Sequence, residues 1–218
     1  GKAIASHLLE AGVEDIEFAN GSFTIAGTDR SVSIMEIAQQ INDGLKLPKD
    51  APQSLDVDHL TDPGPATFPN GCHICEVEVD PDTGHVKILS FVVAQDAGRA
   101  IHKGYVEGQM QGGVAQGIGW ALNEEYIYDD KGRLANPGFL DYRIPVASDL
   151  PYIETVIVEV PNPNHPFGVK GVGEVNICPA MAAVANAVAD AVGRRMESLP
   201  ISPPKLLAAL KERQESEL

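Results

Sequence analysis

The residues best suited to chemistry lie in residues 166–174, which read Pro-Phe-Gly-Val-Lys-Gly-Val-Gly-Glu. Three glycines recur at every second or third position, and the carboxylate of Glu174 follows just before an expected helix. Glycines let the backbone adopt positive φ or approach a bulky ligand. Amides exposed at a helix start favour anions and can bond ligand oxygens. A carboxylate placed there is a candidate general base.

The same stretch also has a purely structural interpretation. The three glycines, Gly168, Gly171 and Gly173, could serve only to form a tight turn, and Glu174 could cap the helix that follows. Nothing within the nine residues separates the two interpretations, so the choice depends on the rest of the sequence.

A second stretch, residues 107–119, alternates glutamines with glycines in the order Glu-Gly-Gln-Met-Gln-Gly-Gly-Val-Ala-Gln-Gly-Ile-Gly. A glutamine amide offers a donor and an acceptor together, which suits a ligand rich in ring nitrogens and phosphate oxygens. The structural alternative is a glycine-packed helix with solvent-facing glutamines. The stretch is not a dinucleotide fingerprint, because no strand and phosphate-loop turn directly precede it.

Four segments in this order, residues 71–84, 109–119, 140–145 and 168–174, resemble the molybdenum-binding large subunit of the xanthine dehydrogenase and aldehyde oxidase family. The resemblance extends over roughly residues 66–212. A glutamine and glycine helix followed by Gly-Val-Lys-Gly-Val-Gly-Glu is highly specific to that family. The detail is most similar to the bacterial carbon monoxide or aldehyde dehydrogenase branch.

Carried over residue by residue, the resemblance makes Glu174 the catalytic base. Gln109 falls on the glutamine that hydrogen-bonds the pterin and the region of the metal ligands. The other positions close to the cofactor are Gly112, Gly113, Gln116, Gly117, Lys170, Gly171, Val172 and Gly173. No residue of this chain is expected to ligate the metal. A useful base has a raised pKa, which burial in a glycine-lined pocket would provide if Lys170 does not neutralise it.

The resemblance also implies a reaction, a cofactor and partners. The reaction is oxidative hydroxylation of an aldehyde, an N-heterocycle or a related small molecule, with water as the oxygen source. The cofactor is a molybdenum-molybdopterin cytosine dinucleotide. Electrons would pass to iron-sulfur and FAD partner subunits, since three cysteines cannot hold clusters that take four thiolates each. The complete enzyme would be a dimer of heterotrimers.

Family large subunits are several times longer than this chain. The resemblance therefore implies a C-terminal fragment or a split subunit, which the upstream part of the large subunit would complete. Much of the substrate pocket would belong to that upstream part, so the substrate cannot be named from these residues.

The elements that must position these residues predict an α+β fold. Residues 1–46 read as a small helix, hairpin and helix subdomain, with an Asn20-Gly21 turn and a helix that Ser33 caps together with Glu36. Residues 47–70 are rich in proline and predict an extended crossing segment. Residues 71–218 form the C-terminal molybdopterin-binding domain.

Within residues 71–218 the patterns predict a two-layer domain with a mixed sheet and packed helices. A Pro-Asp-x-Gly turn at residues 81–84 predicts a hairpin. Apolar residues at helical spacing predict a helix over residues 104–122. A strand at 156–160, a helix at 179–192 and a last helix at 204–212 complete the expected order.

Composition restricts the classes of partner. The 218 residues are 44% hydrophobic, which is enough for one good core. A formal net charge of -15 repels phosphates, so neither nucleic acid nor an anionic membrane is an expected partner. The longest apolar stretch, residues 179–192, is too short to span a membrane. With three cysteines and no visible signal peptide, the expected location is the cytoplasm.

The Cys72-His73-Ile74-Cys75 motif suggests a metal site as an alternative. Alternation along a strand sends the two cysteines to opposite faces, and no second pair completes a tetrahedral zinc site. We therefore predict a packing role for the pair, and a packed or hydrogen-bonded role for His73.

Two functions of other classes remain open. A non-catalytic module for cofactor docking or assembly, lacking any metal, predicts that Glu174 caps a helix or pairs with Lys170. A different α+β nucleotide-binding protein predicts tight binding of a common nucleotide to the glycine loop.

Overall fold

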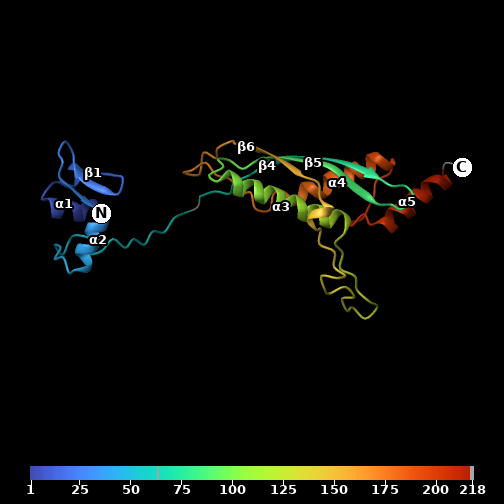
Figure 1. The fold of residues 1–218 in the computed structure, drawn as a ribbon, viewed down its shortest axis with the longest axis horizontal. Coiled ribbons are helices and arrows are strands. Elements are labelled where there is room, and N and C mark those ends of the chain that lie inside the picture. Colours follow the sequence, from blue (N-terminus) through green and yellow to red (C-terminus); the bar gives the residue numbers. More distant parts are fainter. Residues whose placement is uncertain (63, 217–218) are drawn as a thin grey trace. The chain divides into compact units, whose positions relative to one another are not determined.

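The computed structural model describes residues 1–62 and 64–216, with side chains up to residue 212. It divides into two units, Gly1–Asp62 and Pro63–Leu218 (Figure 1). Both contain helices and a small sheet, which confirms the predicted α+β class. Among the described residues no helix is long and apolar enough to cross a membrane.

The first unit packs two helices with a three-stranded antiparallel sheet. Its helices are α1 (Lys2–Leu9) and α2 (Ile34–Asn42), and its strands are β1 (Ile16–Ala19), β2 (Ser22–Ile25) and β3 (Ser31–Ser33). The predicted hairpin is present, because Asn20 and Gly21 both adopt the positive φ that its tight turn requires. Ser33 and Glu36 form the predicted capping box at the start of α2. Strand β3, three residues long, was not expected from the sequence.

The second unit is built on a mixed sheet in the order β4-β5-β6. Strands β4 (Asn70–Val79) and β5 (Val86–Asp96) form the predicted antiparallel hairpin, and β6 (Ile153–Val158) pairs with β5 in parallel. The central strand β5 buries Val86 and Ile88 and, after an irregularity in the pairing with β4, Phe91 and Val93, all in one hydrophobic core. These side chains define the face of the sheet on which the helices pack.

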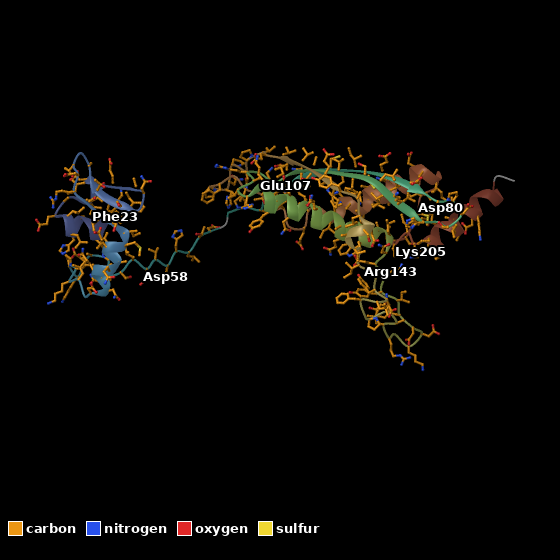
Figure 2. All side chains as sticks on the ribbon, viewed as in Figure 1. Phe23, Asp58, Asp80, Glu107, Arg143 and Lys205 are labelled. Atoms are coloured by element: carbon orange, nitrogen blue, oxygen red, sulfur yellow. The ribbon has the colours of Figure 1, made fainter. Side chains whose placement is uncertain are left out.

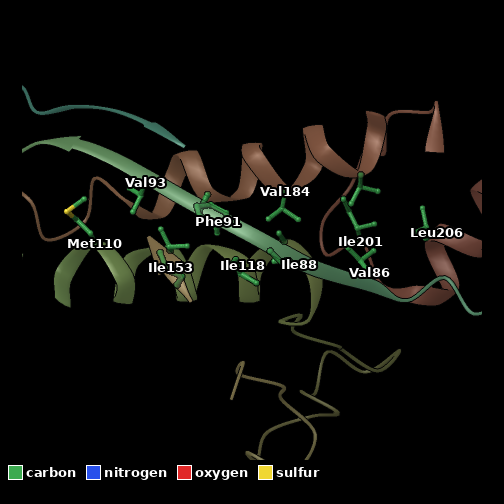
Figure 3. Packing of buried hydrophobic residues seen from close by; sticks show 14 of the residues in the cluster. Val86, Ile88, Phe91, Val93, Met110, Ile118, Ile153, Val184, Ile201 and Leu206 are labelled. Atoms are coloured by element: carbon green, nitrogen blue, oxygen red, sulfur yellow. The ribbon is translucent and has the colours of Figure 1, made fainter. Parts of the chain in front are cut away.

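Helices α3 (Lys103–Leu122) and α4 (Ile177–Val192) cover that face, and the core lies between them and β5 (Figure 3). Helix α4 presents Ala180, Val184 and Val188, all fully buried, at helical spacing. Helix α5 (Pro203–Ser216) adds Leu206 to the same core. The predicted two-layer arrangement of a mixed sheet and packed helices is confirmed.

Two glycines allow α3 and α4 to pack closely. A Cβ built on Gly117 would lie 2.6 Å from the Cβ of Ala180, and one built on Gly113 would lie 2.9 Å from the Cβ of Asn176. Both distances are too short for real side chains, so any larger residue would push the helices apart. This packing accounts for part of the glycine content of α3.

Two predicted boundaries were wrong by a few residues. Strand β6 begins at Ile153, which pairs with Phe91, and it ends before Val160 because the amide of Val160 donates to the Asp96 carboxylate. Helix α4 begins two residues before Pro179. A proline is tolerated there because the first-turn amides of a helix have no partner within the helix.

A long loop, residues 123–152, connects α3 to β6, and Arg143 lies in its returning half, near the base (Figure 2). At its base, a hydrogen bond with Glu124 raises the pKa of Tyr142 to about 12. The ring of Tyr142 also lies 5.2 Å from that of Tyr126. A Cβ on Gly119 would lie 2.7 Å from Cδ of Pro145, so this glycine lets the returning loop lie against α3.

The packing of α3 predicts opposite effects for one substitution at two positions. Gly117→Ala places a methyl group against Ala180 and should lower the free energy of unfolding by about 1–3 kcal/mol. Gly108→Ala meets no atom within 4 Å and should raise it by about 0.5–1 kcal/mol through helix propensity. Urea unfolding of both variants checks the pair, and equal effects at the two positions would contradict the packing.

Candidate functional site

Helix α3 presents a polar face made of Gln109, Gly112 and Gln116, called the glutamine face below. The spacing of three and four residues puts them on one side of the helix, and all three are exposed. Gly113 and Gly117 lie on the neighbouring buried side, against α4. Of these five residues, the three of the glutamine face are exposed, whereas Gly113 and Gly117 admit α4.

Residues 168–174, called the catalytic loop below because they end at the candidate base Glu174, run beside the end of β5. The amide of Lys170 donates to the carbonyl of Ala97 at 3.0 Å, and the amide of Arg99 donates to the carbonyl of Gly168 at 2.9 Å. Gly98 lies between these bonds with a positive φ, and a Cβ there would lie 2.3 Å from the Gly168 oxygen. A glycine is therefore required where the loop meets the strand end.

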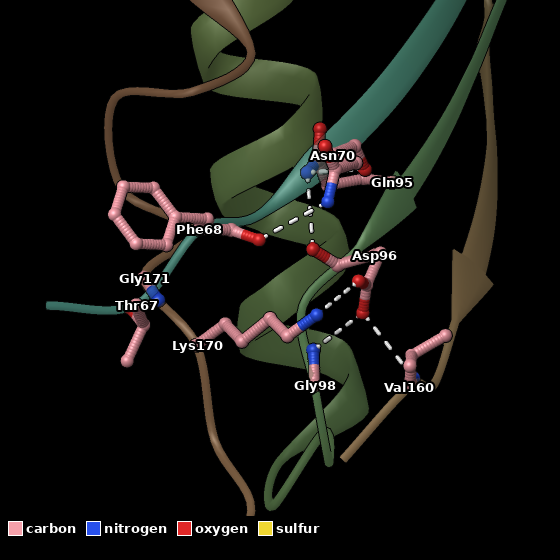
Figure 4. A network of polar contacts seen from close by, with 9 residues as sticks. All are labelled: Thr67, Phe68, Asn70, Gln95, Asp96, Gly98, Val160, Lys170 and Gly171. Atoms are coloured by element: carbon pink, nitrogen blue, oxygen red, sulfur yellow. Dashed lines mark hydrogen bonds and ion pairs between the residues drawn. The ribbon is translucent and has the colours of Figure 1, made fainter. Parts of the chain in front are cut away.

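Asp96 links the catalytic loop to the ends of strands β5 and β6 (Figure 4). One carboxylate oxygen lies 2.5 Å from Nζ of Lys170, and the other accepts from the amides of Gly98 and Val160 at 2.9 and 3.2 Å. Burial raises the pKa of Asp96, but the hydrogen bonds from Lys170, Gly98 and Val160 outweigh it and hold the pKa below its usual range. Asp96 is therefore a buried, charged anchor.

The far end of the catalytic loop lies against the glutamine face. A Cβ on Gly173 would lie 4.0 Å from Oε1 of Gln109. The buried side chain of Asn176 donates from Nδ2 to the carbonyl of Val172 at 3.1 Å and packs on Gly113. Two regions predicted separately from the sequence, the glutamine face and the loop that carries Glu174, thus meet in the structure.

Glu174 is exposed, so the expected burial of this carboxylate in a glycine-lined pocket is not provided by the residues that the structure describes. Its carboxylate makes no hydrogen bond or ion pair within residues 1–62 and 64–216. Lys170 is held by Asp96, and α4 begins with Asn176 at its N-cap. Glu174 therefore neither caps the helix nor pairs with Lys170, the two arrangements expected of a non-catalytic docking module.

A hollow of about 220 Å³ lies between the start of α3 and the catalytic loop. Three residues proposed from the sequence line it, namely Gln109, Lys170 and Val172. Arg99 and the stacked rings of His102 and Tyr105, 4.0 Å apart, line it as well. It is open and mostly apolar, with a guanidinium and the amide of Gln109 at its edges.

The glycines of α3 fall into two groups that differ in what surrounds them. Gly113 and Gly117 are required by the packing of α4. At Gly108 and Gly112 a Cβ would meet no atom within 4 Å, and neither has a positive φ. Glycine inside a helix costs roughly 1 kcal/mol relative to alanine. Packing within the chain therefore gives no reason for these two glycines, and they leave free space on the exposed side of α3.

The packing role predicted for the two cysteines holds for Cys75 but not for Cys72. Cys72 is exposed, whereas Cys75 points toward the core, and burial raises the pKa of its thiol to about 12. His73 is partly buried with its ring edge-on to Phe91, and burial lowers its pKa. In the part of the chain that the structure describes, no group of three or more histidine, cysteine or acidic side chains could hold a metal ion.

Four residues at this site were missed by sequence reasoning: Asp96, Arg99, His102 and Tyr105. Asp96, Gly98 and Arg99 follow the strand that was predicted, and an Asp-x-Gly-x sequence after a buried strand could have indicated a turn anchored by the carboxylate. His102 accepts a hydrogen bond at Nδ1 from the amide of Tyr105 and so caps α3. A histidine cap is unusual, and the sequence carried no clear signal for it.

Residues 1–151 match the model of the molybdopterin cofactor-binding domain family, and the chain belongs to that family. It is thereby related to the large subunits of molybdenum hydroxylases such as carbon monoxide and xanthine dehydrogenases, which confirms the predicted resemblance. The match begins at residue 1, so the relationship extends beyond residues 66–212 into the first unit.

Two curated relatives and one solved structure illustrate the likeness. The 6-hydroxypseudooxynicotine dehydrogenase complex subunit gamma of Paenarthrobacter nicotinovorans is 35% identical over 95% of this chain and 26% of its own length. The carbon monoxide dehydrogenase large chain of Hydrogenophaga pseudoflava is 31% identical over 97% and 26%. The structure of quinoline 2-oxidoreductase from Pseudomonas putida 86 superposes with a TM-score of 0.82 at 36% identity, over 97% of this chain and 28% of that one. The chain thus spans about a quarter of the length of these relatives.

The anchor at Asp96 predicts an acid-sensitive contribution to stability. Because the pKa of Asp96 is lower in the folded chain, its stabilisation is present above the unfolded-state pKa and is lost as the pH falls through the folded-state pKa. Asp96→Asn should lower the free energy of unfolding by about 3 kcal/mol at pH 7, because Lys170 loses its buried partner. The difference in free energy of unfolding between Asp96→Asn and the unaltered protein should become smaller below about pH 4.

Urea unfolding across this pH range measures this difference. Glu125→Gln removes one partner of an exposed pair with Lys205 and serves as the control, with an expected change below about 0.5 kcal/mol. A difference for Asp96→Asn that stays constant with pH would rule out the charged anchor.

Proposed function

We propose that this chain supplies the catalytic base and part of the cofactor cradle of a molybdenum hydroxylase. The reaction is oxidative hydroxylation of an aldehyde, an N-heterocycle or a related small molecule. Glu174 is the base. The cradle consists of the glutamine face together with Lys170, Gly171, Val172 and Gly173, with Gly113 and Gly117 supporting it through the packing of α4.

The observation that carries the proposal is the free space above α3 and the catalytic loop. Gly112 and Gly171 have no atom within 4 Å of a built Cβ, and at Gly173 only the amide oxygen of Gln109 comes that close. The exposed amides of Gln109 and Gln116 flank this surface with donors and acceptors. A flat ligand with many ring nitrogens and phosphate oxygens fits such a glycine-lined, amide-edged surface. The residues present therefore fit a molybdopterin cofactor.

Each part of the site then has a defined task. When bound, the cofactor supplies a redox-active metal that takes up the electrons of the substrate. The unpaired carboxylate of Glu174 accepts a proton as the new carbon–oxygen bond forms. Lys170 is held by Asp96 and leaves that carboxylate unneutralised. Covering by the rest of the protein would exclude water from Glu174 and favour proton uptake.

The remaining parts of the proposal rest on the relatives. One of them is by name a subunit of a dehydrogenase complex, which supports partner subunits for this chain. We propose that these partners carry iron-sulfur centres and FAD, that the cofactor is the cytosine dinucleotide form, and that the complete enzyme is a cytoplasmic dimer of heterotrimers. The division into residues 1–46, 47–70 and 71–218 is likewise proposed as the functional arrangement.

Replacement of the base tests the chemistry. Glu174→Gln keeps the size of the side chain and removes its ability to accept a proton, so turnover per bound molybdenum should fall by about 10²–10⁴-fold in the complete enzyme. Metal analysis and release of the nucleotide should give the same molybdenum and cytidine content as in the unaltered enzyme.

A matched control is Glu154→Gln, which changes an exposed glutamate on β6 and should leave turnover unchanged. Substantial turnover in the Glu174→Gln enzyme would show that another group is the base. Absence of molybdenum and pterin from the intact native assembly would instead favour the cofactor-docking alternative.

The free space at Gly112 predicts a loss of cofactor without a loss of fold. A Cβ at Gly112 meets no atom within 4 Å and the position is exposed, so Gly112→Leu should not lower the free energy of unfolding, whereas its side chain would occupy the proposed cradle. Molybdenum content should fall severalfold. Glu107→Leu, on another side of α3, is the control and should keep its molybdenum. Full molybdenum content in Gly112→Leu would exclude the glutamine face as part of the cradle.

A further inference from the structure

We propose that Asp96 is a positioning residue for the reaction. Through Lys170 it fixes the catalytic loop at the ends of β5 and β6, and in this way it sets where Glu174 stands. The inference rests on the proposed function of Glu174, and it adds a residue that lies outside the motifs of the sequence.

The Asp96 carboxylate joins three segments of the chain. Its Oδ2 binds Nζ of Lys170 in the catalytic loop, and its Oδ1 binds the amide of Gly98, after β5, and that of Val160, after β6. The side chains of Asp96 and Lys170 are only 10% and 12% exposed. Water screens such a pair weakly, so each charge depends on the other.

Another feature is the rigidity of the anchor. Asp96 ends the central strand of the sheet and is paired on both sides, with Asn70 of β4 and Val158 of β6. The neighbouring Gln95 is fully buried, and its Nε2 donates to the carbonyls of Asn70 and Asp96 at 2.9 and 3.1 Å. The carboxylate therefore projects from a strand end that is held by strands on both sides.

The segment of chain between Lys170 and Glu174 is short, only residues 171–173. Between them the loop is held by two hydrogen bonds of 3.3 and 3.1 Å, from the amide of Gly171 to Thr67 and from Asn176 to the carbonyl of Val172. Val172 also packs against the hydrophobic core. With Lys170 at one end and these contacts at the other, a shift at Lys170 changes the course of the short segment that leads to the base. A misplacement of about 1 Å at a reacting group can cost on the order of 10²-fold in rate.

A last feature is the direction of the Lys170 charge. Lys170 lies four residues before Glu174, and in this structure its ammonium binds Asp96 rather than that carboxylate. An opposite charge beside a carboxylate favours the ionised form and weakens it as a base. Asp96 therefore holds the loop in position and also binds the Lys170 ammonium, which leaves the Glu174 carboxylate without that cation.

The decisive variant is the neutral double substitution Asp96→Asn with Lys170→Met in the complete enzyme. The asparagine oxygen can still accept from the amides of Gly98 and Val160, and methionine leaves no buried charge without a partner, so the protein should fold. We expect a KM within about threefold and a kcat per bound molybdenum lower by about tenfold or more. Because Lys170 also belongs to the proposed cradle, the molybdenum and nucleotide content of each preparation is measured and kcat is expressed per bound molybdenum. The conservative variant Lys170→Arg keeps an ion pair and should retain more activity than the double variant.

Controls separate this inference from the proposed function. Lys205→Met breaks an exposed ion pair with Glu125 and should change neither kcat nor molybdenum content. A double variant whose kcat per bound molybdenum is unchanged would overturn the positioning role, whether or not its melting temperature or its molybdenum content falls. Glu174→Gln measured alongside distinguishes the two failures, because an active Glu174→Gln enzyme would refute the base itself.

Discussion

The close approach of α3 and α4 is the constraint on which the rest of the site depends. Gly113 and Gly117 allow Asn176 and Ala180 to lie directly on α3, at distances that no larger side chain would permit. Since α4 follows the catalytic loop in the chain, this contact brings the loop alongside the glutamine face. The same helix thus uses its glycines in two ways. Gly113 and Gly117 on its buried side admit α4, and Gly108 and Gly112 on its exposed side leave free space, where we propose that the cofactor binds.

Charge gives the site its second organising feature. The chain carries a formal net charge of -15, and the one lysine in the catalytic loop is held by a buried aspartate. Glu174 is left as an exposed carboxylate without a partner in the described residues. An arrangement that only stabilised the loop could have paired Lys170 with Glu174, which is close in sequence. The pairing with Asp96 instead keeps a free carboxylate where a base would be needed.

Much of the fold could be predicted because its signals are local. The Asn20-Gly21 turn, the Ser33 and Glu36 capping box and the glycine and glutamine pattern of α3 each specify their structure within a few residues. Strand β3 was missed because three residues give no readable alternation. The end of β6 was misplaced because the Val160 amide bonds a carboxylate 64 positions away in the sequence.

The residues of the site, like the elements of the fold, could be predicted where their signals are local in the sequence. Residues within a motif, such as Gln109 and Glu174, could be named from the sequence, whereas the partner of Lys170 could not, because the pair with Asp96 spans 74 positions. The expected burial of Glu174 was also not found in the described residues. The chain spans about a quarter of its relatives' length. We therefore propose that the groups that bury Glu174 belong to the rest of the complete protein.

The central claim is that the glutamine face and the catalytic loop together hold a molybdenum cofactor beside Glu174. The most direct measurement is anomalous X-ray scattering at the molybdenum edge from crystals of the complete native protein. The account predicts one strong molybdenum peak next to the Glu174 carboxylate, with continuous ligand density over Gly112 and between Gln109 and Gln116. A molybdenum peak remote from Glu174, or density for the cofactor on another surface, would contradict it.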